Sequence, residues 1–323
     1  MPKMTPPPFI WFNGTMMPWA DAQVHVMTHA LHYGSSVFEG IRVYETPDGP
    51  RGFRITDHLK RLHDSARIYR MDVPFDVDTL LTACGQLVQS NELPSAYIRP
   101  IVFRGAGTLG VAPTPDTPVE VAVAAVKWGA YLGDEAMANG VDVCMSSWQR
   151  YAPNTLPAMA KAGGNYLSGQ LIAEEAHRLG FSEGIALSTS GMLSEGSGEN
   201  LFIVRDGKIY TPPAGASILY GITRDTVFQL AAAEGIEVIE QDMPREILYL
   251  ADEIFFTGTA AEITPVRSVD RIAVRSEGRG PITKRLQDLF FGLFSGQTPD
   301  QHGWLETLPN KESAVHGQPA VSV

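Results

Sequence analysis

The stretch Ala160-Lys161-Ala162-Gly163-Gly164-Asn165-Tyr166 places a lysine among small residues, directly before a predicted helix from about Gly164 to Arg178. Small neighbours let a planar ligand approach the lysine amine. Lysine is the amine nucleophile that forms Schiff bases with carbonyl compounds, and desolvation lowers its pKa for that role. Taken alone, the spacing favours an ordinary loop lysine, so other motifs must decide its function.

Three further clusters place polar residues in glycine-rich or small-residue surroundings. Ser194-Glu-Gly-Ser-Gly-Glu-Asn-Leu201 carries two glutamates, which form either a solvated turn or a fixed anion beside a ligand. Leu219-Tyr-Gly-Ile-Thr-Arg-Asp225 opens a predicted helix whose first N–H groups suit a phosphate, although a plain capped helix fits equally well. Phe256-Thr-Gly-Thr-Ala-Ala-Glu262 ends a predicted strand and also places backbone donors for an anion. An amine, an acid and two anion sites together indicate pyridoxal phosphate.

The composition indicates a folded protein whose partners are neither nucleic acid nor a membrane. Lys plus Arg is 25 and Asp plus Glu is 36, a formal net charge of −11, whereas nucleic acid and anionic membranes require a basic footprint. The 323 residues predict one large or two medium domains. Two cysteines, Cys84 and Cys144, cannot build a disulfide framework, so we expect a reducing, cytoplasmic location. We expect neither a signal peptide nor a membrane-spanning segment.

Hydrophobic spacing and turn residues predict a mixed α+β chain, and irregular alternation of the elements argues against a doubly wound parallel sheet. Asn13-Gly14 predicts a hairpin between strands at 9–12 and 15–17. Helices are predicted at 57–69, 78–89, 164–178, 223–234 and 281–293. Further strands are predicted at 40–45, 52–55, 96–103, 119–126, 141–146, 201–204, 238–240 and 254–256, and around 185.

Two motifs fit their usual ligands poorly. Gly105-Ala-Gly-Thr-Leu-Gly110 matches the G-x-G-x-x-G pattern of dinucleotide-binding folds, but Pro113 and the prolines after it exclude the helix that must follow. His25, His29 and His32 have helical spacing, but the glutamate of an HExxH zinc site is missing. We therefore expect neither a dinucleotide nor a metal ion.

The chain resembles the bacterial branched-chain amino acid aminotransferases, which are fold-type IV pyridoxal phosphate enzymes. The resemblance extends from about Ile10 to Leu308 and rests on several long, ordered motifs. These are Phe38-Glu-Gly-Ile-Arg-Val-Tyr44, Ala96-Tyr-Ile-Arg-Pro100, Lys127-Trp-Gly-Ala-Tyr-Leu-Gly133, Ala158-Met-Ala-Lys-Ala-Gly-Gly-Asn-Tyr166, Ser194-Glu-Gly-Ser-Gly-Glu-Asn200, Gly221-Ile-Thr-Arg-Asp225 and Gly258-Thr-Ala-Ala-Glu-Ile-Thr-Pro265. It implies two domains: a small N-terminal α/β domain at 1–126 and a larger, β-barrel-like cofactor-binding domain at 136–310. An interdomain loop at 127–135 and a loose tail at 311–323 complete the expected organisation.

The same resemblance implies pyridoxal 5′-phosphate as cofactor and assigns residues to it. Lys161 would form the Schiff base with the cofactor and then move a proton, and Glu195 would pair with the protonated ring nitrogen. Tyr166 would hydrogen-bond the ring phenolate oxygen. The other cofactor-binding residues would be Arg61, Leu219, Ile222, Thr223 and Thr259, all but Leu219 on the phosphate.

The substrates implied are leucine, isoleucine and valine, which exchange an amino group with 2-oxoglutarate. One pocket must then accept both an aliphatic side chain and a carboxylate. Tyr97 and Arg99 would form its polar end, and the N–H groups of Thr259 and Ala260 would bind the α-carboxylate. The remaining pocket residues would be Tyr33, Phe38, Val111, Trp128 and Tyr131. Tyr33 and Val111 would come from the neighbouring subunit of a homodimer, the smallest functional unit, with a hexamer as the larger assembly.

Other fold-type IV enzymes are the alternatives: a D-amino acid transaminase, an (R)-amine transaminase or an aminodeoxychorismate lyase. Tyr97-x-Arg99 and the loop at 127–133 favour the branched-chain enzyme. A catalytically silent binding protein is the alternative from another class, and the joint presence of Lys161 with its partners argues against it. Tyr220 and Arg104 depart from the family pattern, and they bear on substrate range or loop motion.

Overall fold

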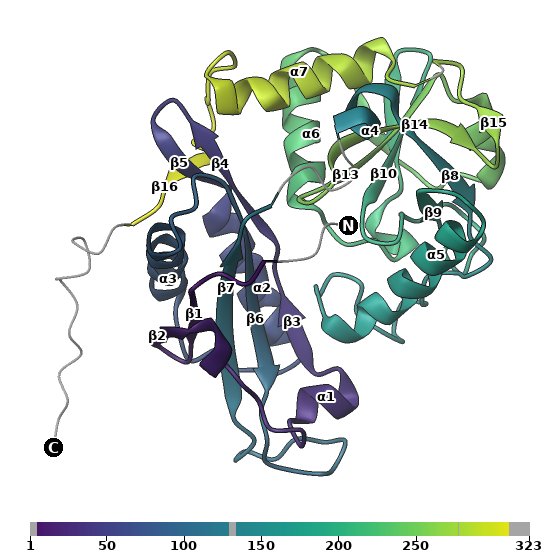
Figure 1. Ribbon diagram of the computed structural model, residues 1–323. Coiled ribbons are helices and arrows are strands. Elements are labelled where there is room, and N and C mark those ends of the chain that lie inside the picture. The colour runs from purple at the N-terminus through teal and green to yellow at the C-terminus, as the bar shows by residue number, and fades with distance from the viewer. Residues whose placement is uncertain (1–4, 129–133, 277, 310–323) are drawn as a thin grey trace, which may run out of the picture. The chain divides into compact units, whose positions relative to one another are not determined.

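The chain forms two compact units in a computed structural model that describes residues 5–128, 134–276 and 278–309 (Figure 1). The first unit comprises Met1–Trp128 together with Asp300–Val323, and the second comprises Gly129–Pro299. Each unit has its own eight-stranded sheet, and helices accompany both sheets. The protein is therefore an α+β chain.

The first unit is built on an antiparallel sheet in the order β16-β5-β4-β6-β7-β1-β2, with β3 also paired to β6. Its strands are β1 (Phe9–Phe12), β2 (Thr15–Pro18), β3 (Ser36–Phe38), β4 (Ile41–Thr46), β5 (Gly49–Phe53), β6 (Ala96–Arg104), β7 (Val119–Val126) and β16 (Leu305–Thr307). Its helices are α1 (His29–Tyr33), α2 (Ile55–Ile68) and α3 (Val77–Ser90), with a 3-10 turn at Trp19–Asp21.

Local sequence explains several of these elements. The predicted hairpin is confirmed, because Asn13 and Gly14 both adopt the positive φ angles that its two-residue turn requires. Helix α2 buries Leu59, Leu62 and Ala66 at helical spacing. Helix α3 begins after Asp76, whose carboxylate accepts a hydrogen bond from the Thr79 N–H at 2.8 Å. The two helices pack together and against strands of the sheet.

The second unit has a mixed sheet in the order β12-β11-β10-β13-β14-β8-β9, with β15 paired to β14. Its strands are β8 (Val141–Met145), β9 (Glu183–Ile185), β10 (Asn200–Arg205), β11 (Lys208–Thr211), β12 (Val238–Glu240), β13 (Glu253–Gly258), β14 (Glu262–Val269) and β15 (Ile272–Ala273). Its helices are α4 (Asp134–Asn139), α5 (Tyr166–Arg178), α6 (Ile222–Ala233) and α7 (Pro281–Ser295), with 3-10 turns at Gly163–Asn165, Ala214–Ala216 and Arg245–Leu250.

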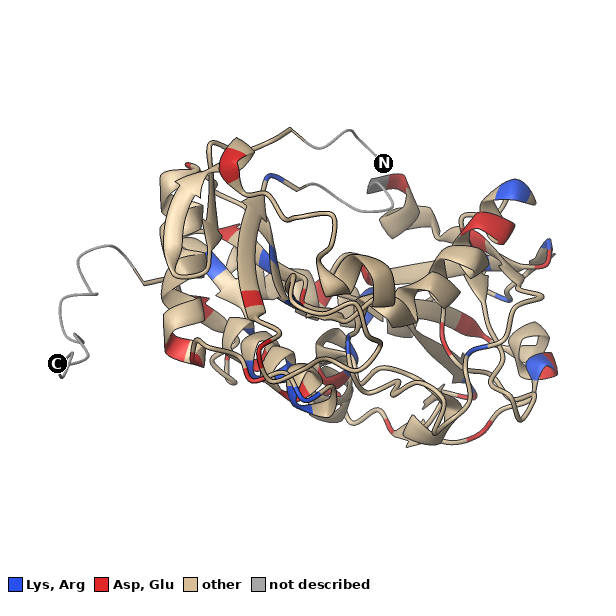
Figure 2. Cartoon of the chain, turned by 90° about the horizontal axis from the view of Figure 1, so that it is seen from below, with Lys and Arg blue, Asp and Glu red and all other residues tan. Residues whose placement is uncertain are grey.

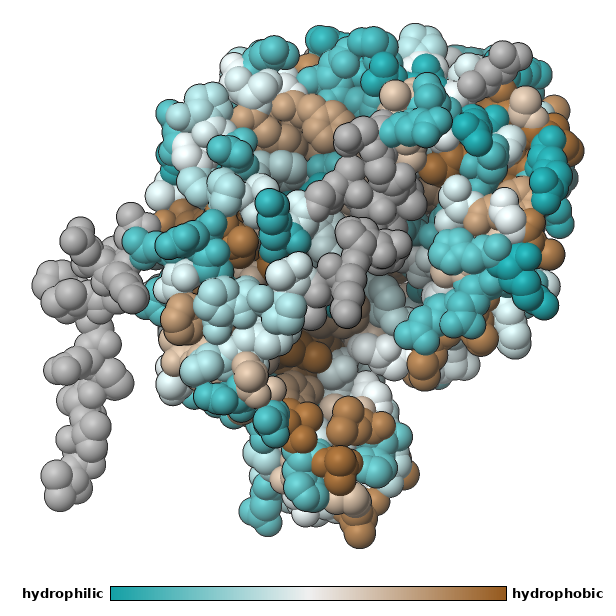
Figure 3. Space-filling view, in the orientation of Figure 1, coloured by the Kyte–Doolittle hydropathy of each residue, from teal (hydrophilic) through white to brown (hydrophobic). Residues whose placement is uncertain are grey.

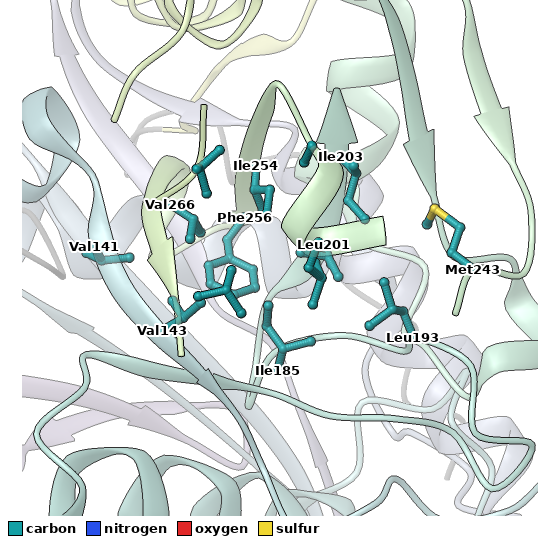
Figure 4. Close-up of a cluster of buried hydrophobic side chains, with 14 residues drawn as sticks. Val141, Val143, Ile185, Leu193, Leu201, Ile203, Met243, Ile254, Phe256 and Val266 are labelled. Carbon is teal, nitrogen blue, oxygen red and sulfur yellow. The ribbon is translucent and has the colours of Figure 1, made fainter. Parts of the chain in front are cut away.

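A cluster of buried aliphatic and aromatic side chains forms a core of the second unit (Figure 4). It joins Val143 of β8, Leu201 of β10, Phe256 of β13 and Val266 of β14. Helix α5 contacts β9, and helices α6 and α7 contact β13. This core holds the strands whose ends carry the candidate site residues.

The structure differs from the predicted domain boundaries in two places. The expected second domain, 136–310, included the C-terminal strand, but β16 pairs with β5, so residues from Asp300 onward belong to the first unit. Strand β16 has only three residues and pairs with a strand about 250 residues earlier, so no local sequence pattern marks it. The expected interdomain loop ended at 135, but α4 begins at Asp134. The predicted tail at 311–323 lies outside the described residues.

Acidic and basic residues are interspersed in both units (Figure 2). Some of these oppositely charged residues form ion pairs, such as Arg54–Asp57 within the first unit and Arg285–Glu234 within the second. No helix in the described parts of the chain is long and apolar enough to cross a membrane.

Candidate active site

The second unit brings Lys161 and Tyr166 together at the start of α5. Nζ of Lys161 donates a hydrogen bond to Oη of Tyr166 at 2.6 Å and lies 5.1 Å from the centre of its ring. The amide of Asn165 donates to the carbonyl oxygens of Pro157 and Ala160, which fixes the segment that carries the lysine. A 3-10 turn at Gly163–Asn165 precedes α5, where a longer helix was predicted.

Glu195 presents a buried carboxylate that three donors hold. Nη2 of Arg150 lies 2.7 Å from Oε1 of Glu195, while the amide of Asn200 and the N–H of Leu219 donate to Oε2 at 3.0 and 3.1 Å. Burial raises the pKa of Glu195, and the Arg150 charge and the Leu219 hydrogen bond oppose that rise. The carboxylate is thus fixed in place, and a cationic ligand would favour its charged form.

Two more buried glutamates flank this carboxylate. Glu183 accepts hydrogen bonds from Gly184 N–H, Ser197 N–H and Ser197 Oγ. Glu199 accepts one from Gly198 N–H at 3.0 Å. Burial, reinforced by the Glu183 charge, raises the pKa of Glu199 well above its ordinary value. The environment of Glu199 therefore favours its protonated, uncharged form.

Two backbone segments carry N–H groups that suit an anion. Ile222 and Thr223 form the first turn of α6, and the first-turn N–H groups of a helix are a common anion-binding site. Thr259 and Ala260 lie in the turn between β13 and β14. Oγ1 of Thr257, just before that turn, is buried and has no hydrogen-bond partner among the described residues. A buried hydroxyl without a partner needs one, and a ligand bound at this turn would supply it.

Glycine lets these segments approach one another. A Cβ atom on Gly221 would lie 2.1 Å from Oδ1 of Asn200, so only glycine allows the α6 turn so close to the residue that holds Glu195. An amine with a phenol, a fixed carboxylate and two sets of N–H donors match the aldehyde, the ring nitrogen and the phosphate of pyridoxal phosphate. The residues of the second unit therefore fit this cofactor.

In the first unit, an aromatic cluster forms around Arg99 on the sheet. The Arg99 guanidinium lies 4.7 Å from the ring centre of Phe38 and donates to the Tyr97 hydroxyl at 3.3 Å. The Tyr97 ring stacks on Trp128 at 4.9 Å. Tyr97 and Arg99 are two residues apart on β6, so both point to one face. Tyr131, also assigned to this pocket, lies outside the described residues.

Tyr33 and Val111 lie on neighbouring segments of the first unit. The Tyr33 hydroxyl donates to the carbonyl oxygen of Leu109 at 2.7 Å, and the His29 ring contacts the carbonyl oxygen of Gly110 at 3.1 Å. Helix α1 and the glycine-rich loop between β6 and β7 are therefore tied together, and β7 follows this loop where a dinucleotide fold requires a helix. Side chains along them are exposed and apolar: Val26, Leu31, Leu109 and Val111, the last at 76% exposure. Figure 3 shows apolar surface gathered at this end of the unit.

The predicted cofactor residue Arg61 is on α2 of the first unit, where it pairs with Glu39. Its Nε and Nη2 lie 2.6 and 2.8 Å from the two carboxylate oxygens. The other cations that the sequence places on this helix, Lys60 and Arg67, are exposed. From the sequence alone, Lys60, Arg61 and Arg67 look like one basic surface of the helix. The structure distinguishes Arg61, because it is partly buried and paired with Glu39 while Lys60 and Arg67 are exposed.

Sequence reasoning missed Arg150 and the part played by Asn200. Arg150 is buried and stacks on Tyr151, with its guanidinium 4.8 Å from the ring centre. The Gln149-Arg150-Tyr151 stretch has no motif that would have singled it out. Its only sequence signal is a charged residue in a segment that leads toward the Lys161 motif.

Both residues that depart from the family pattern contact other protein groups. Arg104 donates to the carbonyl oxygens of Tyr69 and Arg70 at the end of α2, where a cation also favours the helix dipole. Tyr220 packs against Arg224, whose guanidinium lies 5.5 Å from the ring centre. The three histidines of the 25–32 segment contact protein atoms, and no cluster of three metal-ligating side chains occurs in the described residues.

Comparison with known proteins identifies the class to which this fold and site correspond. Residues 36–269 match the model of the amino-transferase class IV family, and the chain belongs to this family. It is a pyridoxal phosphate-dependent transferase whose substrates are amino acids and oxo acids.

Close relatives are named for one activity. The branched-chain-amino-acid aminotransferase of Escherichia coli K12 is 58% identical over 301 residues, which cover 93% of this chain and 97% of the relative. A crystal structure of the E. coli enzyme superposes with a TM-score of 0.92 at 56% identity, covering 94% of this chain and 100% of that one. The T.th. branched-chain enzyme with pyridoxamine 5′-phosphate has a TM-score of 0.91 at 45% identity, covering 95% and 100%. The same T.th. enzyme complexed with N-(5′-phosphopyridoxyl)-L-glutamate has a TM-score of 0.89 at 44% identity, covering 94% and 99%.

Proposed function

We propose that this enzyme transfers the amino group between branched-chain L-amino acids and 2-oxoglutarate, and that Lys161 is the residue that bonds pyridoxal phosphate. The observation that carries the proposal is the second unit's pairing of the Lys161 amine with the Tyr166 phenol, 2.6 Å apart, beside a buried and fixed carboxylate. The names of the relatives supply the substrate class.

When bound, pyridoxal phosphate supplies an aldehyde for amines and a ring that withdraws electrons from the substrate Cα. Glu195 binds the protonated ring nitrogen, and Arg150 with Asn200 holds that carboxylate in position. Leu219 contributes its N–H to the same carboxylate. Lys161 takes up and returns the substrate proton at Nζ, and the Tyr166 hydroxyl orients the amine.

The phosphate is bound by N–H groups of Ile222 and Thr223 and by Thr259, with Arg61 as the cation. Pairing with Glu39 fixes the Arg61 guanidinium. The substrate α-carboxylate binds the N–H groups of Thr259 and Ala260. Apart from Arg61, these donors are backbone N–H groups at the start of α6 and in the β13–β14 turn, so their positions are set by the fold and cost little to organise.

The side-chain pocket is formed by Phe38, Tyr97, Trp128 and Tyr131, with Arg99 at its polar end. Aromatic surfaces accept leucine, isoleucine and valine, and the Arg99 guanidinium pairs with the distal carboxylate of glutamate and 2-oxoglutarate. The stacking of Tyr97 on Trp128 supports this assignment, since it gives the pocket a rigid apolar wall.

We further propose a homodimer in which each subunit lends Tyr33 and Val111 to its neighbour, with a hexamer as the larger assembly. The exposed apolar side chains along α1 and the β6–β7 loop support a contact at this surface. The buried free thiols of Cys84 and Cys144 support a cytoplasmic location.

The experiment compares wild type with Lys161→Ala. Wild type should show a visible absorbance band that borohydride removes, and it should convert leucine and 2-oxoglutarate to glutamate. The variant should lack both the band and the activity. If pyruvate with a D-amino acid reacts while leucine does not, the enzyme is a D-amino acid transaminase. A Lys161→Ala variant that keeps the band contradicts the assignment of the lysine.

A further inference from the structure

A fully buried carboxylate in the first unit binds two side chains of α2 at once. Glu39 has no solvent exposure, and Arg61 donates to both of its oxygens at 2.6 and 2.8 Å. Nδ1 of His58, itself 1% exposed, lies 2.7 Å from Oε2 of Glu39. Because an ionised carboxylate only accepts hydrogen bonds, Nδ1 of His58 is the donor. The N–H of Gly40 adds a fourth contact at 3.3 Å.

The fold brings these three residues together through one helix face. Glu39 directly follows β3, and α2 packs against that strand. His58 and Arg61 are three residues apart on α2, so they lie on the same side of the helix. Lys60, next to Arg61 in sequence, is exposed and outside this cluster.

The arrangement fixes the Arg61 guanidinium far more tightly than a surface pair would. Burial alone would raise the pKa of Glu39, but the Arg61 and His58 contacts lower it, so the pKa lies well below its usual range. The pair therefore stays ionised throughout the physiological pH range. A bidentate contact sets the plane of the guanidinium, and His58 sets the position of the carboxylate in turn.

We propose that Glu39 and His58 are positioning residues that orient Arg61 toward the cofactor phosphate. The proposal rests on the assignment of Arg61 to the phosphate in the proposed function. Nε and Nη2 of the guanidinium both donate to Glu39, which fixes the direction in which Arg61 extends from α2. A long, flexible side chain would otherwise lose rotamer freedom each time the cofactor bound.

A purely electrostatic view of Glu39 predicts the opposite effect. The Glu39 charge offsets that of Arg61, so its removal would then strengthen the attraction for a phosphate. Under the positioning role, removal weakens phosphate binding because Arg61 no longer points in one direction. The sign of the change in affinity separates the two views.

The test measures binding of pyridoxal phosphate and of pyridoxal, which lacks the phosphate, to the apoenzyme by absorbance titration. The variants are Glu39→Gln, His58→Gln, Arg61→Lys and the double Glu39→Gln/Arg61→Lys. Lys60→Gln serves as the matched control, because it removes a neighbouring exposed cation from the same helix. Far-UV circular dichroism and the unfolding midpoint verify that each apoenzyme is folded.

We expect Glu39→Gln and Arg61→Lys each to weaken pyridoxal phosphate binding by about tenfold or more, the size of a lost charge-assisted hydrogen bond. His58→Gln should weaken it less, and pyridoxal binding should change by less than about twofold in all of them. The double variant should be no weaker than Arg61→Lys alone, because both residues act through one contact. Lys60→Gln should match wild type.

Three outcomes would overturn the positioning role. Glu39→Gln could bind pyridoxal phosphate as well as wild type or better, while Arg61→Lys binds it weakly. Pyridoxal and pyridoxal phosphate could lose affinity equally, which would show that Glu39 only stabilises the fold. The two single effects could also add fully in the double variant. An Arg61→Lys variant with unchanged binding of both ligands would instead overturn the phosphate assignment itself.

Discussion

Nη2 of Arg150 lies 2.7 Å from Oε1 of Glu195, and both side chains are buried in the second unit. Burial raises the pKa of Glu195, and the Arg150 charge is the strongest influence that opposes the rise. Arg150 therefore favours the ionised form of the carboxylate that is proposed to bind the cofactor ring nitrogen.

Replacing Arg150 with Met should lower kcat by about a hundredfold at neutral pH, a size typical of losing one fixed electrostatic contact. The Glu195 pKa would rise further without the guanidinium, so part of the activity should return as the pH rises and the carboxyl ionises. The measurement is kcat against pH for the leucine reaction.

Arg285→Met is the matched control, since Arg285 forms an exposed ion pair with Glu234 in the same unit. This control should keep the wild-type profile. An Arg150→Met profile that is lowered equally at every pH would mean that Arg150 acts on the fold and not on the charge of Glu195.

Gly221→Ala should disturb the same carboxylate from another side. The added Cβ would lie 2.1 Å from Oδ1 of Asn200, so the amide must move away from Glu195. We expect weaker binding of pyridoxal phosphate, by about tenfold, which is the cost of one lost hydrogen bond to a charged group. Absorbance titration of the apoenzyme measures it.

Gly215→Ala is the control for this substitution, because a Cβ there meets no atom within 4 Å. It should bind the cofactor as wild type does. Equal losses in both variants would indicate a general loss of stability, and no change in Gly221→Ala would show that Asn200 does not support the site.

Arg99→Met should separate the two substrate classes. The guanidinium contacts Phe38 and Tyr97 and is proposed to pair with the distal carboxylate of 2-oxoglutarate. We expect kcat/KM for 2-oxoglutarate to fall by about 10- to 100-fold, the range for a lost hydrogen bond between charged groups. The rate of the leucine half-reaction should change by less than about threefold, because an aliphatic side chain needs no cation.

Arg104→Met provides the comparison, since Arg104 contacts the carbonyl oxygens at the end of α2. Its substrate preference should equal that of wild type, with a small loss of stability. Parallel losses for leucine and 2-oxoglutarate in Arg99→Met would contradict the assignment of Arg99 to the polar end of the pocket.

The elements with strong local signals could be predicted from the sequence, and those set by distant contacts could not. The Asn13-Gly14 turn and the spacing of Leu59, Leu62 and Ala66 are local signals. They predicted a hairpin and a helix, and the structure contains both. Strand β14 was missed because Pro265 interrupts its apolar pattern, although the strand forms. Strand β16 was missed because its partner β5 lies far earlier in the chain.

The same distinction applies to the site. Lys161 and Tyr166 lie five residues apart in one motif, so the sequence singled out both residues, and the structure adds the hydrogen bond between them. Arg150 reaches Glu195 across 45 residues, and Glu39 reaches Arg61 across 22. A sequence motif marks the residue types that a reaction needs, but the partners that fix them are chosen by tertiary packing.

Glu199 should make the stability of the protein fall as the pH rises above about 4.5. Its carboxyl is buried and accepts a hydrogen bond from the Gly198 N–H, and its pKa is raised well above the ordinary 4.5, first by burial and then by the nearby Glu183 charge. Glu195 raises it further, and the Lys161 charge opposes this. The folded state therefore keeps a proton that the unfolded chain releases above about pH 4.5, and stability declines as pH rises toward the folded-state pKa, by about 1.4 kcal/mol per pH unit.

Glu199→Gln keeps the shape of the protonated side chain and cannot ionise, so the decline of stability that Glu199 causes at rising pH should disappear. The variant should equal wild type within about 1 kcal/mol at pH 5, where both side chains are neutral in the folded state, and exceed it at pH 9. Urea unfolding of the apoenzyme from pH 5 to 9 measures this. A Glu199→Gln variant with the wild-type slope would show that Glu199 is already ionised in the folded enzyme.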